Sequence, residues 1–402
     1  MKVLMVNKFL YPNGGSETYV FRLGKQLQKE GCEVQYFGMK DDKNIVGNNV
    51  GSYTSNMDFH SGKLSKLLYP FKIIYSIESR RAIRRVLDDF CPDVVHLNNF
   101  NFQITPSILY EIRKFERQTG QAVKILFTAH DYQLICPNHM MRCPVTESNC
   151  DKCIDGTYGG CVRGKCIHGS AIKSLIGAVE GWVYRTLKVY RKIDVIICPS
   201  AFMQRQLEHH PDLRGRTVML HNFTTVSISG ESLQQEKENY VLYFGRYAKE
   251  KGIETLLKVC ERLPEIPFVF AGKGPYEDQI KKVKNIRNLG FLTAEQLQPV
   301  IAKASFSIYP SEWYENCPFS VMESIQYGTP VIGADIGGIP ELIKNGVTGD
   351  IFTSGNAEEL TVKIRELWED KEKLAVYSDN CLKADFISPE KYVSVLKQYY
   401  GN

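Results

Sequence analysis

Short apolar runs alternate with amphipathic helical patterns along this chain, and the alternation occurs as two separate series. Apolar runs of this length with helices between them are typical of parallel sheets that are covered by helices on both faces. The sequence therefore predicts an α/β protein with two doubly wound, Rossmann-like domains. The runs expected to form strands are 3–9, 32–39, 93–98, 124–130 and 194–199 in the first series, and 240–245, 267–272, 305–310 and 329–334 in the second.

A polar stretch at 227–239 separates the two series, and we interpret it as a linker. The predicted domains are therefore 1–226, which carries a Cys-rich insert at 136–168, and 240–387. In open α/β sheets, ligands bind beyond the carboxyl ends of the strands, where loops meet helix N-termini. We expect the functional residues of both domains at those ends.

The overall composition narrows the class of protein. Lys and Arg number 50 against 45 Asp and Glu, a formal net charge of +5. This mild excess allows an anionic partner, and nucleic acid is not expected to bind. Asn7 and Lys8 interrupt the first apolar run, and no run approaches the ~18 apolar residues of a membrane span. We expect a cytoplasmic protein with reduced thiols.

Two cations follow the first strand of the second series. Gly245 and Arg246 close that strand, and Lys251 and Gly252 come just before a helical pattern. Arg can bind two oxygens at once, Lys adds a point charge, and the helix adds its dipole, so the turn suits a diphosphate. An ordinary surface turn would give the same pattern.

Two carboxylates occur in the segment ENCPFSVME after a later strand. Pro318 is expected in the first helical turn, which places Glu315 in the loop and Glu323 more than a turn into the helix. Backbone N–H groups between them can face an anion, and a carboxylate can accept hydrogen bonds from vicinal sugar hydroxyls. A helix surface next to a loop remains the alternative.

Small residues complete the set at two more strand ends, in AGKGP at 271–275 and GGIPE at 337–341. Glycines there permit close backbone approach to a ligand. The ordered series FGRYAKEKG, AGKGP, ENCPFSVME and GGIPE resembles the retaining glycosyltransferases of family four, the glycogen-synthase-like group 1 enzymes. The N-terminal half is similar more loosely, through Gly14, Gly15 and the segment 128–131. The resemblance implies the GT-B fold of two Rossmann-like domains facing a cleft, and a C-terminal helix at 388–402 that packs back on the N-terminal domain.

The resemblance also implies roles for single residues. Arg246 and Lys251 would bind and stabilise the donor diphosphate, Glu323 would hold the ribose hydroxyls, and Glu315 would contact the donor sugar. His130 would lie beside that sugar, although a lone His after a strand is often a satisfied polar residue. The other donor-binding positions implied are Gly15, Gly245, Gly272, Gly274, Leu292, Asn316, Cys317, Pro318 and Phe319.

The implied activity is the transfer of a hexose, with retention of configuration, from a nucleotide diphosphate to a glycan or lipid-linked acceptor in cell-surface polysaccharide synthesis. UDP is the favoured nucleotide and GDP remains open. No cofactor is required, because cations and helix amides can stabilise the leaving group. The alternatives are a nucleotide-sugar epimerase or a phosphorylase of the same architecture, and a non-catalytic zinc-stapled binding module.

Six of the 12 cysteines crowd into the insert. Reduced cysteines at such density indicate a structural zinc site, and ordinary free thiols are the alternative. The spacing matches no single defined finger, so the six candidate ligands stay together as Cys136, Cys143, Cys150, Cys153, Cys161 and Cys166.

Two basic, amphipathic stretches suit an anionic membrane surface. The first has Leu64, Leu67, Leu68 and Phe71 among lysines, and is followed by Arg80, Arg81, Arg84 and Arg85. The second has Ile172, Leu175, Ile176, Val179 and Val183, with Lys188, Arg191 and Lys192 downstream. They predict a peripheral membrane protein. The alternative is that each apolar stripe packs on the sheet.

Overall fold

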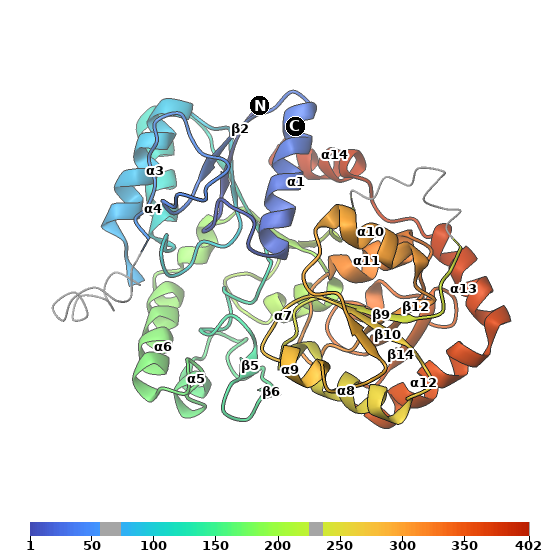
Figure 1. Cartoon of the computed structure of the whole chain (residues 1–402). Helices are drawn as coiled ribbons and strands as arrows, with labels where there is room; N and C mark the ends of the chain where they lie inside the picture. The colour runs from blue at the N-terminus through green and yellow to red at the C-terminus, as the bar shows by residue number, and fades with distance from the viewer. Residues whose placement is uncertain (57–73, 225–235, 402) are drawn as a thin grey trace. The chain divides into compact units, whose positions relative to one another are not determined.

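The structure is a computed structural model that describes residues 1–56, 74–224 and 236–401. The chain divides into unit 1, Met1–Asn222 with Pro389–Asn402, and unit 2, Phe223–Ser388 (Figure 1). Most of the expected linker 227–239 and the stretch with Leu64, Leu67, Leu68 and Phe71 lie outside the described residues.

Unit 1 is built on a parallel sheet with six strands among the described residues, in the order β2-β1-β3-β4-β7-β8. Its strands are β1 (Lys2–Val6), β2 (Glu33–Phe37), β3 (Val94–Leu97), β4 (Lys124–Thr128), β7 (Val195–Cys198) and β8 (Thr217–Met219), and a separate hairpin pairs β5 (Arg142–Cys143) with β6 (Ser148–Asn149). Its helices are α1 (Gly15–Lys29), α3 (Ile77–Phe90), α4 (Ser107–Thr119), α5 (Gly159–Arg163), α6 (Ala171–Thr186), the 3₁₀ turn η1 (Val189–Lys192), α7 (Ala201–Glu208) and α14 (Pro389–Tyr400).

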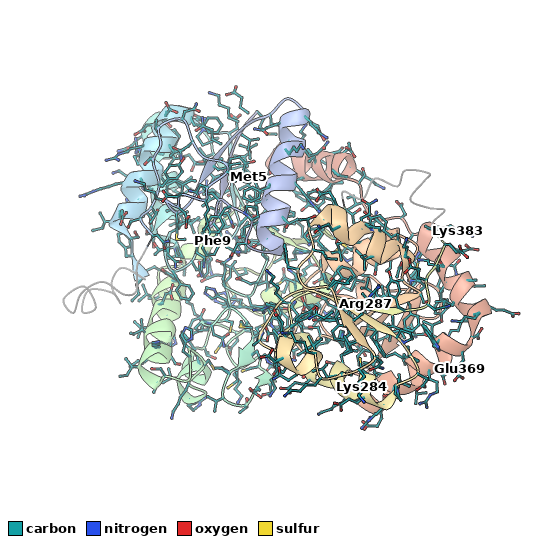
Figure 2. All side chains as sticks on the ribbon, viewed as in Figure 1. Met5, Phe9, Lys284, Arg287, Glu369 and Lys383 are labelled. Carbon is teal, nitrogen blue, oxygen red and sulfur yellow. The ribbon has the colours of Figure 1, made fainter. Side chains whose placement is uncertain are left out.

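The helices of unit 1 cover both faces of this sheet. Figure 1 shows α3 and α4 on one side and α1 with α14 on the other. The strands between them are apolar and buried, as expected for parallel strands covered twice. Figure 2 shows Met5 of β1 among the packed side chains. The strand order reverses between β1 and β3, which defines the switch point of unit 1.

Unit 2 has the order β11-β10-β9-β12-β13-β14 among its described strands, all parallel. The strands are β9 (Val241–Phe244), β10 (Phe268–Ala271), β11 (Ile286–Asn288), β12 (Phe306–Tyr309), β13 (Val331–Ala334) and β14 (Gly349–Phe352). The helices are η3 (Lys249–Lys251), α8 (Ile253–Arg262), α9 (Glu277–Ile280), α10 (Ala294–Lys303), α11 (Phe319–Gln326), η4 (Ile339–Glu341), α12 (Ala357–Glu369) and α13 (Lys371–Leu382).

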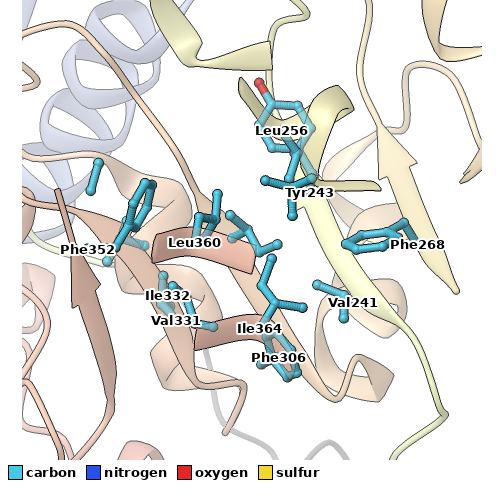
Figure 3. Close-up of a cluster of buried hydrophobic side chains, with 14 of the residues drawn as sticks. Val241, Tyr243, Leu256, Phe268, Phe306, Val331, Ile332, Phe352, Leu360 and Ile364 are labelled. Atoms are coloured by element: carbon cyan, nitrogen blue, oxygen red, sulfur yellow. The ribbon is translucent and has the colours of Figure 1, made fainter. Parts of the chain in front are cut away.

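The core of unit 2 follows from the alternation of side chains along its strands. On β9, Val241 and Tyr243 pack in a cluster with Leu256 of α8 and Leu360 of α12 (Figure 3). Leu242 packs instead in a second cluster that contains residues of α10. Charged side chains such as Glu369 and Lys383 point outward (Figure 2). The predicted α/β class with two doubly wound units is confirmed, and the switch point of unit 2 lies between β9 and β12.

Two local predictions were wrong at helix N-termini. Ser16, directly after Gly14 and Gly15, is predicted from the sequence as the N-cap of the first helix, but α1 begins at Gly15 and Gly14 is its N-cap. Pro318 is the N-cap of α11 and not part of its first turn, with φ −68° and ψ 122° in the extended region. In both helices the N-cap residue forms no side-chain capping hydrogen bond, although Ser, Thr, Asp or Asn is usual at that position.

The C-terminal helix α14 belongs to unit 1 and is joined to it by buried polar contacts. The Tyr392 hydroxyl lies 2.7 Å from the Tyr19 hydroxyl of α1. The Tyr400 hydroxyl lies 2.7 Å from Nδ1 of His96 in β3. Because both tyrosines are buried, α14 completes one face of the unit 1 sheet.

Candidate functional site

An ion pair stands at the switch point of unit 2. Lys251 ends the turn that follows β9, and its Nζ lies 2.5 Å from Oε1 of Glu315, which lies in the loop after β12. Ser311 donates a hydrogen bond of 2.9 Å to the same carboxylate oxygen. The Lys251 side chain is 20% exposed and that of Glu315 8%. The structure thus brings together two residues expected at the site and adds Ser311, for which the sequence carries no local signal.

The other expected cation is less constrained. The guanidinium of Arg246 pairs with Glu250 four residues on, and its side chain is 61% exposed. A pair at this exposure contributes little to stability. Arg246 can therefore change partner at low cost, whereas Lys251 is held by a buried carboxylate.

Two of the glycines expected at the donor site, Gly272 and Gly274, lie against neighbouring backbone. A Cβ at Gly272 would lie 1.9 Å from the carbonyl oxygen of Gly245, and one at Gly274 would lie 2.2 Å from that of Tyr247. These glycines let the loops after β9 and β10 pack together, and their close approach to a ligand stays a prediction.

The GGIPE segment holds the Glu315 loop in the same way. Gly337 has φ +61°, and a Cβ there would lie 2.3 Å from the carbonyl oxygen of Glu315. The next residue, Gly338, donates its N–H to that oxygen at 2.8 Å. A side chain at Gly337 would displace the carboxylate that binds Lys251.

The helices that follow β9 and β12 begin without a capping side chain. Gly252 is the N-cap of α8 and Pro318 that of α11, and neither supplies a side-chain hydrogen bond. In contrast, Thr293, Asn356 and Asp370 cap α10, α12 and α13. No side-chain cap therefore covers the N-terminus of α8 or of α11, the end of a helix at which oxyanions bind.

The remaining expected donor residues occupy different places. Glu323 is half-buried on α11, one turn after Phe319, and both Phe319 and Asn316, in the loop before the helix, are also half-buried. Cys317 is buried, and its Sγ lies 3.6 Å from Sδ of Met322, so its side chain belongs to the core. Leu292 packs on the α10 face of the sheet. Gly15 is the first residue of α1 in unit 1.

His130 stands at the carboxyl end of β4 in unit 1. Its Nε2 lies 2.8 Å from Oδ1 of Asn98, whose Nδ2 donates to the carbonyls of Val6 and His96. That arrangement orients Oδ1 toward the imidazole, so Nε2 carries the proton and Nδ1 is an acceptor. Burial lowers the pKa of His130 to about 3, so the ring is neutral near pH 7.

A polar cavity of about 110 Å³ lies beyond the carboxyl ends of β1, β3 and β4. Burial raises the pKa of Asp131 to about 6, and the backbone N–H of Gln133 and the Lys8 ammonium oppose that rise. Asn7 and Ser16 both donate to Oε1 of Glu17, at 3.0 Å each. The side chains of this cavity that can bind hydroxyls are Lys8, Asn13, Ser16, Glu17, Asn99, Asn101, Asp131, Gln133 and His139. Lys8, Glu17 and Asp131 are not among the site residues expected from the sequence. Lys8 lies in the first apolar run, Glu17 lies just after Gly14 and Gly15, and Asp131 directly follows His130.

Two larger hollows lie elsewhere and do not compete with this assignment. One of about 580 Å³ is lined by Met1, Asp93 and Lys124, at the amino ends of unit 1 strands. One of about 490 Å³ is lined by Tyr240, Pro267 and Ile286, at the amino ends of unit 2 strands. Ligands of open α/β sheets bind at the opposite, carboxyl ends.

The cysteines of the insert gather around one small cavity. Five of the six expected ligands line it, namely Cys136, Cys150, Cys153, Cys161 and Cys166. Cys143 is not among the lining residues, although its side chain hydrogen-bonds with that of Cys166 and its Sγ lies 3.5 Å from the carbonyl oxygen of Gly164. In the part of the chain that the structure describes, no three His, Cys, Asp or Glu side chains are arranged to hold a metal ion as they stand.

Helix α6 turns its large apolar side chains outward. Ile172 is 74% exposed, Leu175 48% and Trp182 41%. The buried face includes the small residues Ser174, Gly177 and Ala178, and a Cβ at Gly181 would lie 2.6 Å from the Tyr158 ring. The alternative that this stripe packs on the sheet is therefore wrong for these residues. Within the described ranges, no helix is both long and apolar enough to span a bilayer.

Two family models match adjoining parts of the chain. Residues 13–227 match the model described as Glycosyltransferase Family 4, and residues 227–383 match the model described as Glycosyl transferases group 1. The first match alone covers more than half of the 402 residues.

Individual relatives are more distant. Sulfoquinovosyl transferase SQD2 of Arabidopsis thaliana is 34% identical over 138 residues, which are 33% of this chain and 27% of that protein's length. O-antigen chain mannosyltransferase C of Escherichia coli is 21% identical over 392 residues, 94% of this chain and 92% of the relative. The solved structure of Anabaena HepE in complex with UDP superimposes with a TM-score of 0.66 at 16% identity, over 99% of each chain. The structural likeness confirms the predicted GT-B fold.

Proposed function

This chain belongs to Glycosyltransferase Family 4, and we propose that it transfers a hexose from a nucleotide diphosphate, UDP by preference, to a glycan or lipid-linked acceptor with retention of configuration. The proposal that a nucleotide sugar binds is supported by the arrangement of residues at the switch point of unit 2. There the Lys251–Glu315 ion pair adjoins the two helices, α8 and α11, that begin without a side-chain cap. A cation beside helix N-termini is a combination that suits a diphosphate.

The reaction needs stabilisation of a leaving group more than it needs a strong base. The acceptor oxygen bonds to the anomeric carbon as the bond from that carbon to the diphosphate breaks. The nucleoside diphosphate leaves with the bonding electrons, and one of its phosphate oxygens takes the hydroxyl proton. Lys251, Arg246 and the first N–H groups of α8 and α11 would stabilise the growing negative charge. Glu315 would orient Lys251 and contact the sugar.

Unit 1 supplies groups suited to sugar and acceptor hydroxyls. The neutral His130 presents Nδ1 as an acceptor, and the cavity beside it offers two carboxylates and an ammonium. Hydroxyl groups can both donate to and accept from such a set. We therefore assign His130 to the donor sugar and the cavity with Asp131 and Glu17 to the acceptor.

The nucleotide is tested by calorimetry and thermal shift with UDP, GDP, ADP and their sugars, without added metal. We expect selective binding of UDP and its sugars. Sugar transfer to an added acceptor would then separate a transferase from an epimerase, which converts the nucleotide sugar without an acceptor. Failure of every nucleotide to bind, together with salt-dependent binding of RNA or DNA, would instead favour the non-catalytic binding module.

Two variants separate the expected roles within the donor site. Glu323→Ala is expected to weaken nucleotide binding roughly 10-fold or more, because it removes a charged acceptor of the ribose hydroxyls. Arg246→Ala is expected to lower kcat and to change the nucleotide Kd little, because its contact strengthens as charge develops. The matched control is Arg262→Ala, at the far end of α8. Equal effects of both variants on Kd and kcat would contradict these roles.

The exposed face of α6 favours an acceptor at a membrane surface. Between residues 171 and 192 the single acidic residue is Glu180, which is buried, whereas Lys173, Lys188 and Arg191 are exposed. An apolar face with basic neighbours and no exposed carboxylate matches an anionic lipid surface. We therefore propose peripheral membrane attachment through Ile172, Leu175, Val179 and Trp182.

Vesicle sedimentation tests this attachment. The protein is expected to sediment with vesicles that contain anionic lipid and to remain in solution with zwitterionic ones. Leu175→Glu should reduce the bound fraction several-fold, because it adds a charge in the middle of the apolar face. Val376→Glu changes an equally exposed apolar residue of unit 2 and is the control. Equal loss in both variants, or equal binding to zwitterionic vesicles, would contradict the assignment.

A further inference from the structure

The insert at 136–168 has little regular structure with which to hold itself. Its described elements are two strands of two residues each and the five-residue α5. Its buried cluster consists of Cys143, Cys153, Tyr158, Cys161, Cys166 and, from α6, Ala178. Cysteines therefore take the positions that large aliphatic side chains take in an ordinary core.

The backbone of the insert is also strained. Among the described residues, nine that are not glycine have positive φ, and five of them lie between 136 and 168. The five are His139, Met141, Glu147, Lys165 and His168. Such conformations persist where the surroundings impose them. Beside the short strands, the thiol packing and hydrogen bonds such as those from Asn138 Nδ2 to the carbonyls of Arg142 and Cys166, a cross-link would add to that constraint.

The arrangement of the cysteines points to what that cross-link is. Five of them line a cavity of about 10 Å³, which holds one water-sized sphere. The other lining residues are Ile135, Pro137, Asn138, Met141, Arg142 and Ile154, so no carboxylate or imidazole is among those that the structure describes there. A lining of soft sulfur around a single-ion space selects zinc over calcium or magnesium.

Four of the five form two chelating pairs. Cys150 and Cys153 are separated by two residues, and Cys150 donates its N–H to the Met141 carbonyl at 2.7 Å, beside the β5–β6 hairpin. Cys161 and Cys166 are linked by a backbone hydrogen bond of 3.1 Å and by a hydrogen bond between their side chains. The fifth, Cys136, points its Sγ at Oδ1 of Asn138, 2.9 Å away.

We propose that Cys150, Cys153, Cys161 and Cys166 bind one zinc ion in the insert, as four thiolates in tetrahedral geometry. The thiols do not converge on one point as they stand. Binding therefore requires the four to lose their protons to solvent and to rotate about χ1 into the cavity that they already line. Cys136 and Cys143 stay outside the set. The site is structural and independent of the proposed transfer reaction.

Elemental analysis of the purified full chain tests the proposal. We expect one zinc per chain, reduced at least tenfold in Cys153→Ser and in Cys161→Ser. Cys136→Ser and Cys143→Ser are expected to keep the metal, as is the control Cys91→Ser outside the insert. Loss of zinc from Cys136→Ser or Cys143→Ser with retention in Cys161→Ser would overturn the ligand set.

Cobalt substitution keeps the test decisive if a variant fails to fold. The zinc-stripped wild-type chain should bind one Co²⁺ with the sulfur charge-transfer absorption and the intense d–d bands of a tetrahedral four-thiolate site, and zinc should abolish both. Absence of these bands, iron in place of zinc, or an intact mass that shows disulfides among the four cysteines would overturn the proposal. None of these readouts requires a substrate, so they are separate from the test of the transferase.

Discussion

Replacing Lys251 with alanine is expected to lower kcat by about 10²–10³-fold, as removal of a positioned charge-stabilising donor does in other enzymes. The reason is its position. Nζ lies 2.5 Å from a carboxylate that is 8% exposed, next to the uncapped N-terminus of α8. A cation fixed in this way needs no reorganisation when negative charge develops on the leaving diphosphate. Steady-state kinetics with the nucleotide sugar that binds in the panel would measure the loss.

A matched control exists within the same turn. Lys249 also lies in η3, but its Nζ pairs with Glu254, and both side chains are more exposed. Lys249→Ala is expected to change kcat less than threefold, since exposed ion pairs contribute little. Wild-type kcat in Lys251→Ala, or an equal loss in both variants, would remove Lys251 from the mechanism.

The second large effect is on stability, and it depends on pH. Burial raises the pKa of Glu180 in α6 to about 8. Among the described contacts, its Oε1 has no hydrogen-bond partner. Between pH ~4.5 and ~8 the folded state therefore keeps a proton that the unfolded state has lost. Stability falls by up to ~1.4 kcal/mol per pH unit across that window as the pH rises.

Glu180→Gln is therefore expected to raise the free energy of unfolding of unit 1 by about 3 kcal/mol at pH 7 to 8, and by little near pH 4.5. Urea unfolding followed by a probe in unit 1 measures the difference, because a chain of two units need not unfold in one step. Glu366→Gln, on the exposed face of α12, controls for the loss of a charge. A change of the same size at both pH values would show that ionisation of Glu180 is not the cause.

The sequence predicted the central strands of both sheets because these strands are continuous apolar runs. It missed β8, β11 and β14, which are edge strands of three or four residues with polar members such as Thr217, Arg287 and Asp350. An edge strand is covered less, so its sequence need not be apolar. Their pairing is decided by the sheet beside them and leaves no local signal.

The candidate site shows the same division between local and non-local information. The motifs identified Lys251 and Glu315 individually, but their ion pair joins residues 64 apart and depends on the β9–β12 neighbour relation. The pairing of Arg246 with Glu250, in contrast, is a local spacing that the sequence could have indicated.

Periodicity identified the apolar stripe of α6 but could not say which face is buried. Gly177 and Gly181 decide that, because their lack of a side chain lets the helix approach Ile167 and Tyr158.

The chain passes from unit 1 to unit 2 near residue 222 and returns near residue 389. During synthesis, every residue of unit 2 is therefore made before the helix that completes unit 1. Until α14 leaves the ribosome, Tyr19 and His96 lack the hydroxyl partners that Tyr392 and Tyr400 supply. Unit 2 can therefore complete its fold before unit 1 does, although most of unit 1 precedes it along the chain. A chain that lacked the residues from Pro389 onward would therefore contain all of unit 2 and an incomplete unit 1.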